Sequence, residues 1–332
     1  MSKITLAKTA GFCFGVNRAV KIAYEVADQN SGGCTLGPII HNKEMVAELA
    51  EKGVRAVDSI DEIGENTPVI IRSHGVERNV YDELKARGVD YIDATCPFVS
   101  KIHKIVREES EQGNIILLAG DKNHPEVQGI VSNCVGDYYT FNNEEELDKI
   151  IKIIPFENNN GISVVAQTTF NEKIWKKCLK NIKKLYTNAK IFDTICNATS
   201  KRQAEAHSLS AQSDCMIVIG DRSSSNTNKL YLICKENCER TYLIQTADEL
   251  DAAMLADAET FGVTAGASTP DRIIKEVLDK MSDLTTSSVN ETENFEEMLE
   301  ESLKSLNTNE RVMGTVASIT PNEVYVEVDG RK

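Results

Sequence analysis

The sequence predicts an α/β fold built from three related units, each with a small, mostly parallel sheet. Up to about residue 280, short apolar runs alternate with amphipathic helical stretches. A short pattern around one cysteine also recurs along the chain, each time where a predicted strand gives way to a helix. Alternating β and α segments favour parallel sheets with helices on their faces. The recurring turn indicates that the alternation is divided into repeated units.

The apolar runs predict twelve strands, or four for each of three units. The ten stronger candidates are Ile4–Lys8, Thr35–Ile40, Pro68–Arg72, Tyr91–Ala94, Asn114–Ala119, Ile162–Ala166, Lys190–Asp193, Cys215–Ile219, Thr241–Ile244 and Phe261–Thr264. The two weaker candidates are Val54–Val57 and Tyr138–Phe141. Helical patterns fall between many of them, including Glu77–Arg87, Val99–Glu111, Glu172–Tyr186 and Pro270–Met281.

The repeated pattern is D-x-x-C-x-x-x-S-K, which occurs at residues 93–101 and again at residues 193–201. In both copies a predicted strand ends, a cysteine follows and a helix begins. Cys13 lies in a similar turn between a strand and a helix. Three such turns, with Cys13, Cys96 and Cys196, predict three related α/β units.

Composition then divides the chain into three parts. The core is expected over 1–280, with units near 14–95, 96–195 and 196–280, followed by a linker over 281–309 and an incomplete domain over 310–332. The expected linker holds seven acidic residues against Lys304 and few large apolar residues, which is typical of a solvated segment. Two strands, Arg311–Val316 and Glu323–Val328, are predicted after it. Two strands alone are marginal, so they indicate the beginning of a further domain.

Charge and composition exclude several classes of protein. The net charge of −14 disfavours nucleic acid and provides no general attraction for anionic ligands, which would need locally placed donors. No apolar run approaches the roughly 20 residues that span a bilayer, and the first residues do not resemble a signal peptide. We therefore expect a cytoplasmic protein. In that reducing compartment, nine cysteines point to metal binding or redox chemistry as well as packing, rather than to disulfides.

Polar side chains gather where predicted strands end. These positions are His41-Asn42, Ser73-His74-Gly75, His124-Pro125-Glu126, Gln167-Thr168-Thr169, Ser223-Ser224-Ser225-Asn226 and Gly266-Ala267-Ser268-Thr269-Pro270. Ligands of open α/β sheets bind at this edge, where helix N-termini favour anions. Three of the five histidines lie there. The pattern predicts a diphosphate site without an arginine clamp; the alternative is that each histidine is an ordinary surface or core residue.

Cys13, Cys96 and Cys196 share the same kind of edge. Three thiolates that converge can hold zinc or an iron–sulfur cluster, and three ligands on a four-iron cluster leave one iron open as a Lewis acid. The alternative is that all three are small buried residues. Cys234 and Cys238 lie in a helical pattern, and we favour packing there. The remaining cysteines carry no functional signal: Cys34, Cys134, Cys178 and Cys215.

Glu126, two residues after His124, is a candidate proton donor. A carboxylic acid can serve in this role if a dry pocket raises its pKa or a partner supplies it with protons. A single glutamate in a loop is normally solvated, so this hypothesis depends on the surrounding motifs.

Together, the motifs resemble those of the LytB family of 4-hydroxy-3-methylbut-2-enyl diphosphate reductases. The residues that carry the resemblance span about 4–280: Gly11-Phe12-Cys13-x-Gly15-Val16, His41-Asn42, Ser73-His74-Gly75-Val76, Asp93-Ala94-Thr95-Cys96-Pro97, His124-Pro125-Glu126-Val127, Gln167-Thr168-Thr169, Ser224-Ser225-Asn226 and Gly262-Val263-Thr264-Ala265-Gly266-Ala267-Ser268. Each motif alone is weak, but eight in order make coincidence very improbable. The one departure is Cys196-Asn197-Ala198-Thr199, whose neighbours vary in the family.

The resemblance implies a trefoil of three α/β units around a central [4Fe–4S] cluster held by Cys13, Cys96 and Cys196. It implies that the diphosphate is bound by His41, His74, His124, Ser224, Ser225, Asn226 and Ser268. Thr168 would orient the hydroxyl end, and Glu126 would donate the proton that lets it leave as water. Two electrons would arrive singly from ferredoxin or flavodoxin. The products would be isopentenyl and dimethylallyl diphosphates, in the last step of the non-mevalonate (MEP) isoprenoid pathway.

The tail has a separate resemblance. Residues 312–316 and 324–330 are similar to the start of an S1-type OB domain, and some reductases of this family are fused to ribosomal protein S1. If the natural chain continues, an RNA-related role would be expected from the missing part. Two alternatives to the reductase are therefore an RNA- or ribosome-associated protein and a zinc hydrolase that uses the same three cysteines.

Overall fold

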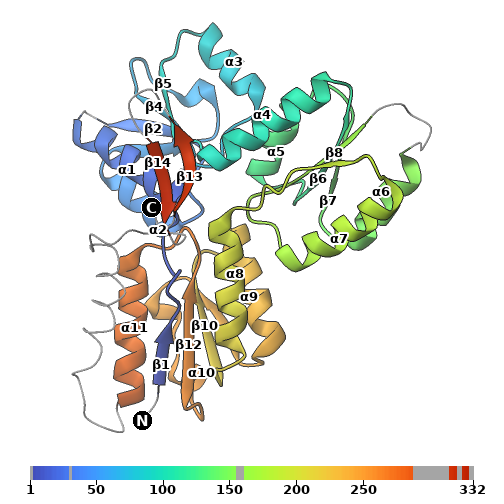
Figure 1. Ribbon diagram of the computed structural model, residues 1–332. Coiled ribbons are helices and arrows are strands. Elements are labelled where there is room, and N and C mark those ends of the chain that lie inside the picture. The colour runs from blue at the N-terminus through green and yellow to red at the C-terminus, as the bar shows by residue number, and fades with distance from the viewer. Residues whose placement is uncertain (1–2, 30–31, 155–160, 287–313, 320–323, 329–332) are drawn as a thin grey trace. The chain divides into compact units, whose positions relative to one another are not determined.

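The computed structural model describes residues 3–29, 32–154, 161–286, 314–319 and 324–328 (Figure 1). The chain forms two compact units, one of residues 15–200 and the other of residues 1–14 with 201–332.

The unit of residues 15–200 contains two four-stranded sheets. The first has the order β3-β2-β4-β5, with β2 at Gly33–Leu36, β3 at Val54–Val57, β4 at Val69–Ile71 and β5 at Tyr91–Asp93. All three pairings are parallel. The accompanying helices are α1 (Phe14–Gln29), α2 (Lys43–Glu51) and α3 (Arg78–Ala86), with a short 3₁₀ turn at Ile60–Glu62. Because the strands are parallel, their carboxyl ends meet at one edge.

The second sheet of this unit has the same design. Its order is β7-β6-β8-β9, with β6 at Ile115–Ala119, β7 at Tyr138–Phe141, β8 at Ile162–Ala166 and β9 at Lys190–Ile191. The helices are α4 (Pro97–Glu111), α5 (Pro125–Val131), α6 (Glu144–Ile153) and α7 (Glu172–Leu185). Phe141, Phe170 and Trp175 fill the apolar layer beside this sheet, where they are almost fully buried.

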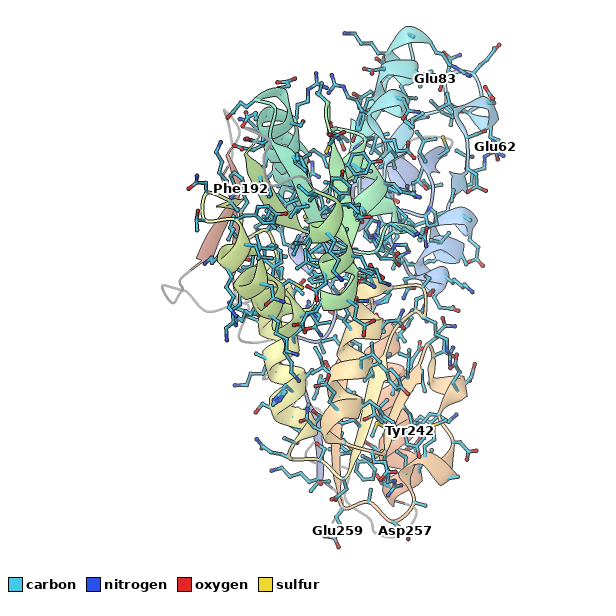
Figure 2. All side chains as sticks on the ribbon, turned by 90° about the vertical axis from the view of Figure 1, so that its right-hand side faces the viewer. Glu62, Glu83, Phe192, Tyr242, Asp257 and Glu259 are labelled. Atoms are coloured by element: carbon cyan, nitrogen blue, oxygen red, sulfur yellow. The ribbon has the colours of Figure 1, made fainter. Side chains whose placement is uncertain are left out.

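The other unit holds the third four-stranded parallel sheet, in the order β1-β12-β10-β11. The strands are β1 (Lys3–Leu6), β10 (Cys215–Ile219), β11 (Thr241–Ile244) and β12 (Thr260–Ala265), and the helices are α8 (Asn197–Ser210), α9 (Ser225–Asn237), α10 (Ala252–Leu255) and α11 (Asp271–Thr286), with a 3₁₀ turn at Ala247–Glu249. Asp257 and Glu259 mark the amino end of β12 (Figure 2). The strands' carboxyl ends lie at the opposite edge.

The predicted fold class is confirmed: twelve strands form three small parallel sheets of four. The strand expected over Thr35–Ile40 is shorter and ends at Leu36, because Pro38 has no N–H group with which to continue the ladder. The last core helix, expected to end at Met281, continues to Thr286. The arrangement of the three units as a trefoil stays a prediction.

The described part of the tail is an antiparallel pair, β13 (Gly314–Ile319) with β14 (Val324–Val328). Two strands were expected in this part of the tail. Residues 281–286 of the predicted linker over 281–309 form the end of α11, and the rest of it lies outside the described residues. Among the described helices, none is long and apolar enough to cross a membrane.

Phe141→Ala should lower the free energy of unfolding by about 3–5 kcal/mol, because a fully buried ring would leave a cavity in a packed layer. Urea unfolding followed by the fluorescence of Trp175, the chain's one tryptophan, reports on the same cluster. Ile153→Ala, at a side chain that is 63% exposed, is the matched control and should change stability by no more than about 0.5 kcal/mol. Equal losses in the two variants would contradict the assignment of this core.

Candidate functional site

Three histidines from the two sheets of the unit formed by residues 15–200 meet in one cluster. His41 follows β2, His74 follows β4, and His124 is the N-cap of α5. The ring centroids are 4.4 Å apart for His41 and His74, 5.2 Å for His41 and His124, and 5.5 Å for His74 and His124. One ring nitrogen from each lies within 4.8 Å of the others. The three strand-end histidines therefore lie in a single cluster.

Hydrogen bonding and burial determine the charge of this cluster. His124 Nδ1 accepts the backbone N–H of Glu126 at 3.1 Å, so the ring proton of a neutral His124 lies on Nε2. Burial lowers the pKa of His74 well below its usual range, and the neighbouring His41, His124 and Arg72 lower it further. His74 Nδ1 finds no hydrogen-bond partner among the described residues. His74 is therefore neutral near pH 7, with polar capacity left for a ligand.

This protonation state favours an anion over a metal ion. A histidine that ligates a metal normally donates its second ring N–H to another group. In His124, Nδ1 instead accepts an N–H, so the ring proton is on Nε2. Nε2 then has no lone pair for a metal ion unless the ring loses this proton too. Nε2–H can donate to an anion's oxygen. The cluster therefore fits phosphate oxygens better than zinc.

Glu126 and Thr168 form a buried pair in the same unit. Glu126 lies in the first turn of α5 and is 1% exposed. One carboxylate oxygen accepts the backbone N–H of Thr168 at 2.6 Å, and the other accepts the Thr168 hydroxyl at 2.8 Å. The burial that a proton-donating carboxyl requires is thus present, and Thr168 holds the carboxyl group in one orientation.

Each of the three predicted ligand cysteines is bonded through its backbone to a predicted substrate-binding segment. Cys96 N–H donates to the carbonyl of Ser73 at 2.9 Å, directly before His74. Cys196 N–H donates to the carbonyl of Thr168 at 3.0 Å. In the other unit, Cys13 N–H donates to the carbonyl of Ala267 at 3.2 Å, directly before Ser268. In each case the cysteine turn is fixed to the end of a neighbouring strand that carries a polar site residue.

The same three cysteines differ from the other six in their surroundings. Each directly precedes a helix or caps its N-terminus and is partly exposed, a setting that favours thiolates. The others lie in or against apolar clusters: Cys34, Cys134, Cys178, Cys215, Cys234 and Cys238. Burial raises the thiol pKa of Cys134 and Cys215 to about 11 and that of Cys178 and Cys234 to about 12. Packing accounts for Cys234 and Cys238, as their sequence pattern indicated.

The unit of residues 1–14 and 201–332 has a polar helix N-terminus of its own. Ser224 is the N-cap of α9, and its hydroxyl accepts the N–H of Thr227 at 3.3 Å. Asn226 is 5% exposed, and its Nδ2 has no partner among the described residues. Ser268 follows β12, which pairs with the β10 strand that leads to Ser224. These residues lie at one carboxyl edge, where free N–H groups and the helix dipole favour an anion.

The sequence motifs missed one cation at this edge. Lys229 donates from Nζ to the Ser225 hydroxyl at 3.0 Å, one turn into α9. The available signal was the i,i+4 spacing of Ser225 and Lys229, which places both on the same helix face. The cluster of hydroxyl and amide groups therefore has a lysine beside it. In the other unit Arg72 lies near His74, and the expected absence of an arginine clamp stays a prediction.

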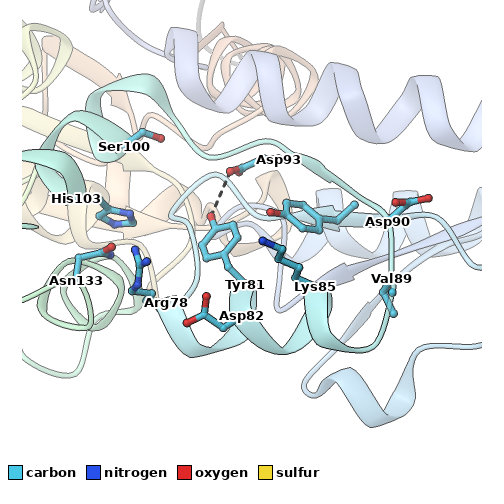
Figure 3. A pocket seen from close by; sticks show the side chains of 12 residues that line it. Arg78, Tyr81, Asp82, Lys85, Val89, Asp90, Asp93, Ser100, His103 and Asn133 are labelled. Carbon is cyan, nitrogen blue, oxygen red and sulfur yellow. Dashed lines mark hydrogen bonds between the residues drawn. The ribbon is translucent and has the colours of Figure 1, made fainter.

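A concave region lies along α3 and β5 (Figure 3). This pocket of about 630 Å³ is lined by charged residues of both signs and by Tyr81 and Tyr91, and its lining includes none of the predicted site residues. His103 forms part of its wall and also lies behind the site, because a Cβ added to Gly75 would approach the His103 ring to 3.1 Å. Gly75 also has a φ of 73°, which favours glycine directly after His74.

Comparisons with known proteins show the family to which the chain belongs. The profile of the family described as "LytB protein" matches residues 4–282. The chain is 44% identical to the 4-hydroxy-3-methylbut-2-enyl diphosphate reductase of Caldanaerobacter subterraneus subsp. tengcongensis, over 87% of this chain and 100% of the relative. It is 38% identical to the enzyme of the same name from Clostridium acetobutylicum, over 100% of this chain and 52% of the relative.

Two solved structures are similar as well. One is a structure of (E)-4-hydroxy-3-methyl-but-2-enyl diphosphate reductase, described as the terminal enzyme of the non-mevalonate pathway. It is 40% identical, with a TM-score of 0.61 over 85% of this chain and 100% of the other. The other is the E-1-hydroxy-2-methyl-but-2-enyl-4-diphosphate reductase from Plasmodium falciparum, 24% identical, with a TM-score of 0.81 over 92% of this chain and 99% of the other. The second likeness supports the fold.

The buried His103 should make the protein less stable in acid. Burial lowers the pKa of His103 to about 4, whereas an unfolded histidine has a pKa of about 6.5. Between these values the unfolded chain binds more protons, so the free energy of unfolding should fall as the pH drops below about 6.5. His103→Gln should remove about 1 kcal/mol of the difference between pH 7.5 and 5.5, as measured by urea unfolding. An unchanged pH dependence would contradict this assignment.

Proposed function

This chain belongs to the LytB family, and on that premise we propose that it reduces 4-hydroxy-3-methylbut-2-enyl diphosphate to isopentenyl diphosphate and dimethylallyl diphosphate. This is the last step of the non-mevalonate isoprenoid pathway. One observation carries the proposal: in three places a cysteine N–H donates a hydrogen bond to a carbonyl at the end of a neighbouring strand. The three acceptors are the carbonyls of Ser73, Thr168 and Ala267. In each case this bond connects a proposed cluster ligand to a proposed substrate-binding segment.

Cys13, Cys96 and Cys196 would hold a [4Fe–4S] cluster. They fit that group because they are the three cysteines that lie at helix N-termini and are only partly buried, whereas burial raises the thiol pKa of several of the others. When bound, such a cluster supplies single electrons and an iron without a protein ligand that acts as a Lewis acid.

The diphosphate would be bound by neutral donors. His124 Nε2–H and the rings of His41 and His74 supply donors in one unit. Ser224, Ser225, Asn226 and Ser268 supply hydroxyl and amide groups at the strand edge of the other. Because the net charge of the chain is −14, local N–H and O–H donors have to provide the recognition that the protein's overall charge does not.

Glu126 would donate the proton that turns the leaving hydroxyl into water. Thr168 bonds both carboxylate oxygens and would hold the acid toward the hydroxyl end of the substrate. In the balanced reaction, two electrons and two protons enter while the allylic C–O bond breaks. One proton leaves with the hydroxyl group as water, and the other goes to either end of the allyl group, which yields the two products.

The electrons would come from ferredoxin or flavodoxin, and the protein would work in the cytoplasm. We further propose that residues 1–280 form the reductase core, with units near 14–95, 96–195 and 196–280. Residues 281–309 would be largely linker, and residues 310–332 would begin an S1-type OB domain. The alignment of the whole chain with 52% of the longer Clostridium acetobutylicum relative supports a reductase that carries further sequence. The comparisons lend no support to a zinc hydrolase or an RNA adaptor as the main function.

Iron and sulfide analysis of anaerobically purified protein tests the proposal directly. About four irons and four sulfides per chain are expected, together with reduction of the diphosphate substrate by dithionite-reduced dye. Cys96→Ser should lose iron and activity, whereas Cys178→Ser, in the apolar layer of the second sheet, should keep the iron. Zinc without sulfide in the wild-type protein would overturn the proposal.

Glu126→Gln should lower kcat by about 10²–10⁴-fold, the usual contribution of general acid catalysis, with little change in KM. The amide keeps the size of the carboxyl group but has no acidic proton to donate. Glu145→Gln on exposed α6 is the control and should retain wild-type kinetics. Steady-state kinetics with the diphosphate substrate provide the measurement, and normal turnover by Glu126→Gln would remove this residue as the acid.

A further inference from the structure

Arg18 lies on the second turn of α1 and bonds the backbone that leads to Cys96. Its Nη1 donates to the Thr95 carbonyl at 3.3 Å, and its Nη2 donates to the Asp93 carbonyl at 3.1 Å. These are the carbonyls at the end of β5 and directly before the cysteine. The planar guanidinium holds its two N–H groups in a fixed geometry, which the flexible side chain of lysine does not reproduce. The strand end is therefore tied to α1 at two points.

The first turn of α1 also touches Cys96 itself. A Cβ added to Gly15 would lie 2.5 Å from Cys96 Sγ and 3.0 Å from its Cβ. Only glycine allows the helix to pass this close to the thiol. Gly15 and Arg18 are three residues apart, so they present the same face of α1 to the Cys96 segment.

The other side of this segment is bonded to β4. Ala94 N–H donates to the Ile71 carbonyl at 3.1 Å, and Cys96 N–H donates to the Ser73 carbonyl at 2.9 Å. The N–H groups of Ala94 and Cys96 thus bond toward β4, and the Thr95 N–H donates to Asp93 Oδ1 at 2.9 Å. The carbonyls of Asp93 and Thr95 accept from Arg18. Without Arg18, these two carbonyls would lose their charged partner on the side of the helix.

Arg18 also brings a charge that no ion pair offsets. Among the described residues it bonds only the two backbone carbonyls and contacts no carboxylate oxygen. Its positive charge therefore remains next to the segment that carries a predicted cluster ligand. Nearby charge and hydrogen bonding are among the factors that set the reduction potential of an iron–sulfur cluster.

A similar relation occurs in the other unit. Arg202, on the second turn of α8, donates to the carbonyls of Thr9 and Ala265. One turn further along, Glu205 accepts from the backbone N–H groups of Lys8 and Thr9, in the segment that leads to Cys13. In both units, a helix that follows one predicted ligand cysteine is hydrogen-bonded to the backbone before another. Helix α1 follows Cys13 and bonds the backbone before Cys96, and α8 follows Cys196 and bonds the backbone before Cys13. This recurrence indicates that these hydrogen bonds hold the cysteine segments in position.

We propose that Arg18 is a positioning residue for Cys96: its guanidinium holds the Asp93–Thr95 backbone in place and keeps a positive charge beside the cluster. The proposal rests on the reductase function proposed above. A stable backbone keeps the Cys96 thiolate in one orientation for iron. The cation favours the reduced, more negative state of the cluster, and so raises its reduction potential.

Three variants of the full chain, purified without oxygen, test this role. Arg18→Gln should lose iron faster in air, shift the midpoint potential negative by about 59 mV, which corresponds to tenfold for one electron, and lower kcat about tenfold. Arg18→Lys should restore most of the potential because it keeps the charge, but should still lose iron faster because the flexible lysine does not hold the two carbonyls in one fixed geometry. Lys21→Gln, exposed on the same helix, should match the wild type.

The outcomes separate the possible roles. Wild-type iron retention and potential in Arg18→Gln would overturn the proposal. Loss of thermal stability in Arg18→Gln with an unchanged potential would make Arg18 a structural staple alone, which also overturns it. If Arg18→Gln does not fold, as judged by near-UV circular dichroism, the difference between Arg18→Lys and the wild type in iron retention decides the question. A wild-type protein that holds no cluster would instead remove the proposed function.

Discussion

The site depends on one backbone hydrogen bond from each predicted ligand cysteine to the end of a neighbouring strand. Cys96, Cys196 and Cys13 donate to Ser73, Thr168 and Ala267, at 2.9, 3.0 and 3.2 Å. Through these bonds, a shift of a cysteine turn would also shift a polar residue beside it, at His74, Thr168 or Ser268. The parallel sheets make this possible, because adjacent strands end at the same edge and their following turns meet there. The bonds couple the positions of the proposed cluster and substrate.

Charge in the site is kept low until a ligand arrives. Burial and mutual repulsion lower the pKa of His74, and the bond from Glu126 N–H sets the ring proton of His124 on Nε2. A neutral His74 beside His41 and His124 avoids part of the repulsion that three cations would suffer. The three rings still offer N–H donors to an anion. Glu126, 1% exposed and held by Thr168, adds an acidic group in the same unit without a mobile, solvated side chain.

The spacing of the motifs predicted the histidines that cluster, but not the basic side chains that bond to the segments around the predicted site. His41, His74 and His124 could be expected to converge because each follows a strand end, and the structure places them within one cluster. Arg18 and Lys229 carried no comparable signal, since a basic residue on a helix is usually solvated. What distinguishes Arg18 is its pair of backbone acceptors, and these belong to a strand about 75 residues away in sequence, at Asp93 and Thr95. No local pattern reports such a contact.

The twelve strands, the parallel α/β class and the turn type that carries Cys13, Cys96 and Cys196 could all be predicted from the amino-acid sequence. This was possible because apolar periodicity and turn residues are local properties. Tertiary structure decided the rest: the end of the strand at Leu36, the protonation of His124, and the close approach of Gly15 to the Cys96 thiol. Each of these depends on which atoms pack around a group, and burial and hydrogen-bond partners come from segments far apart along the chain.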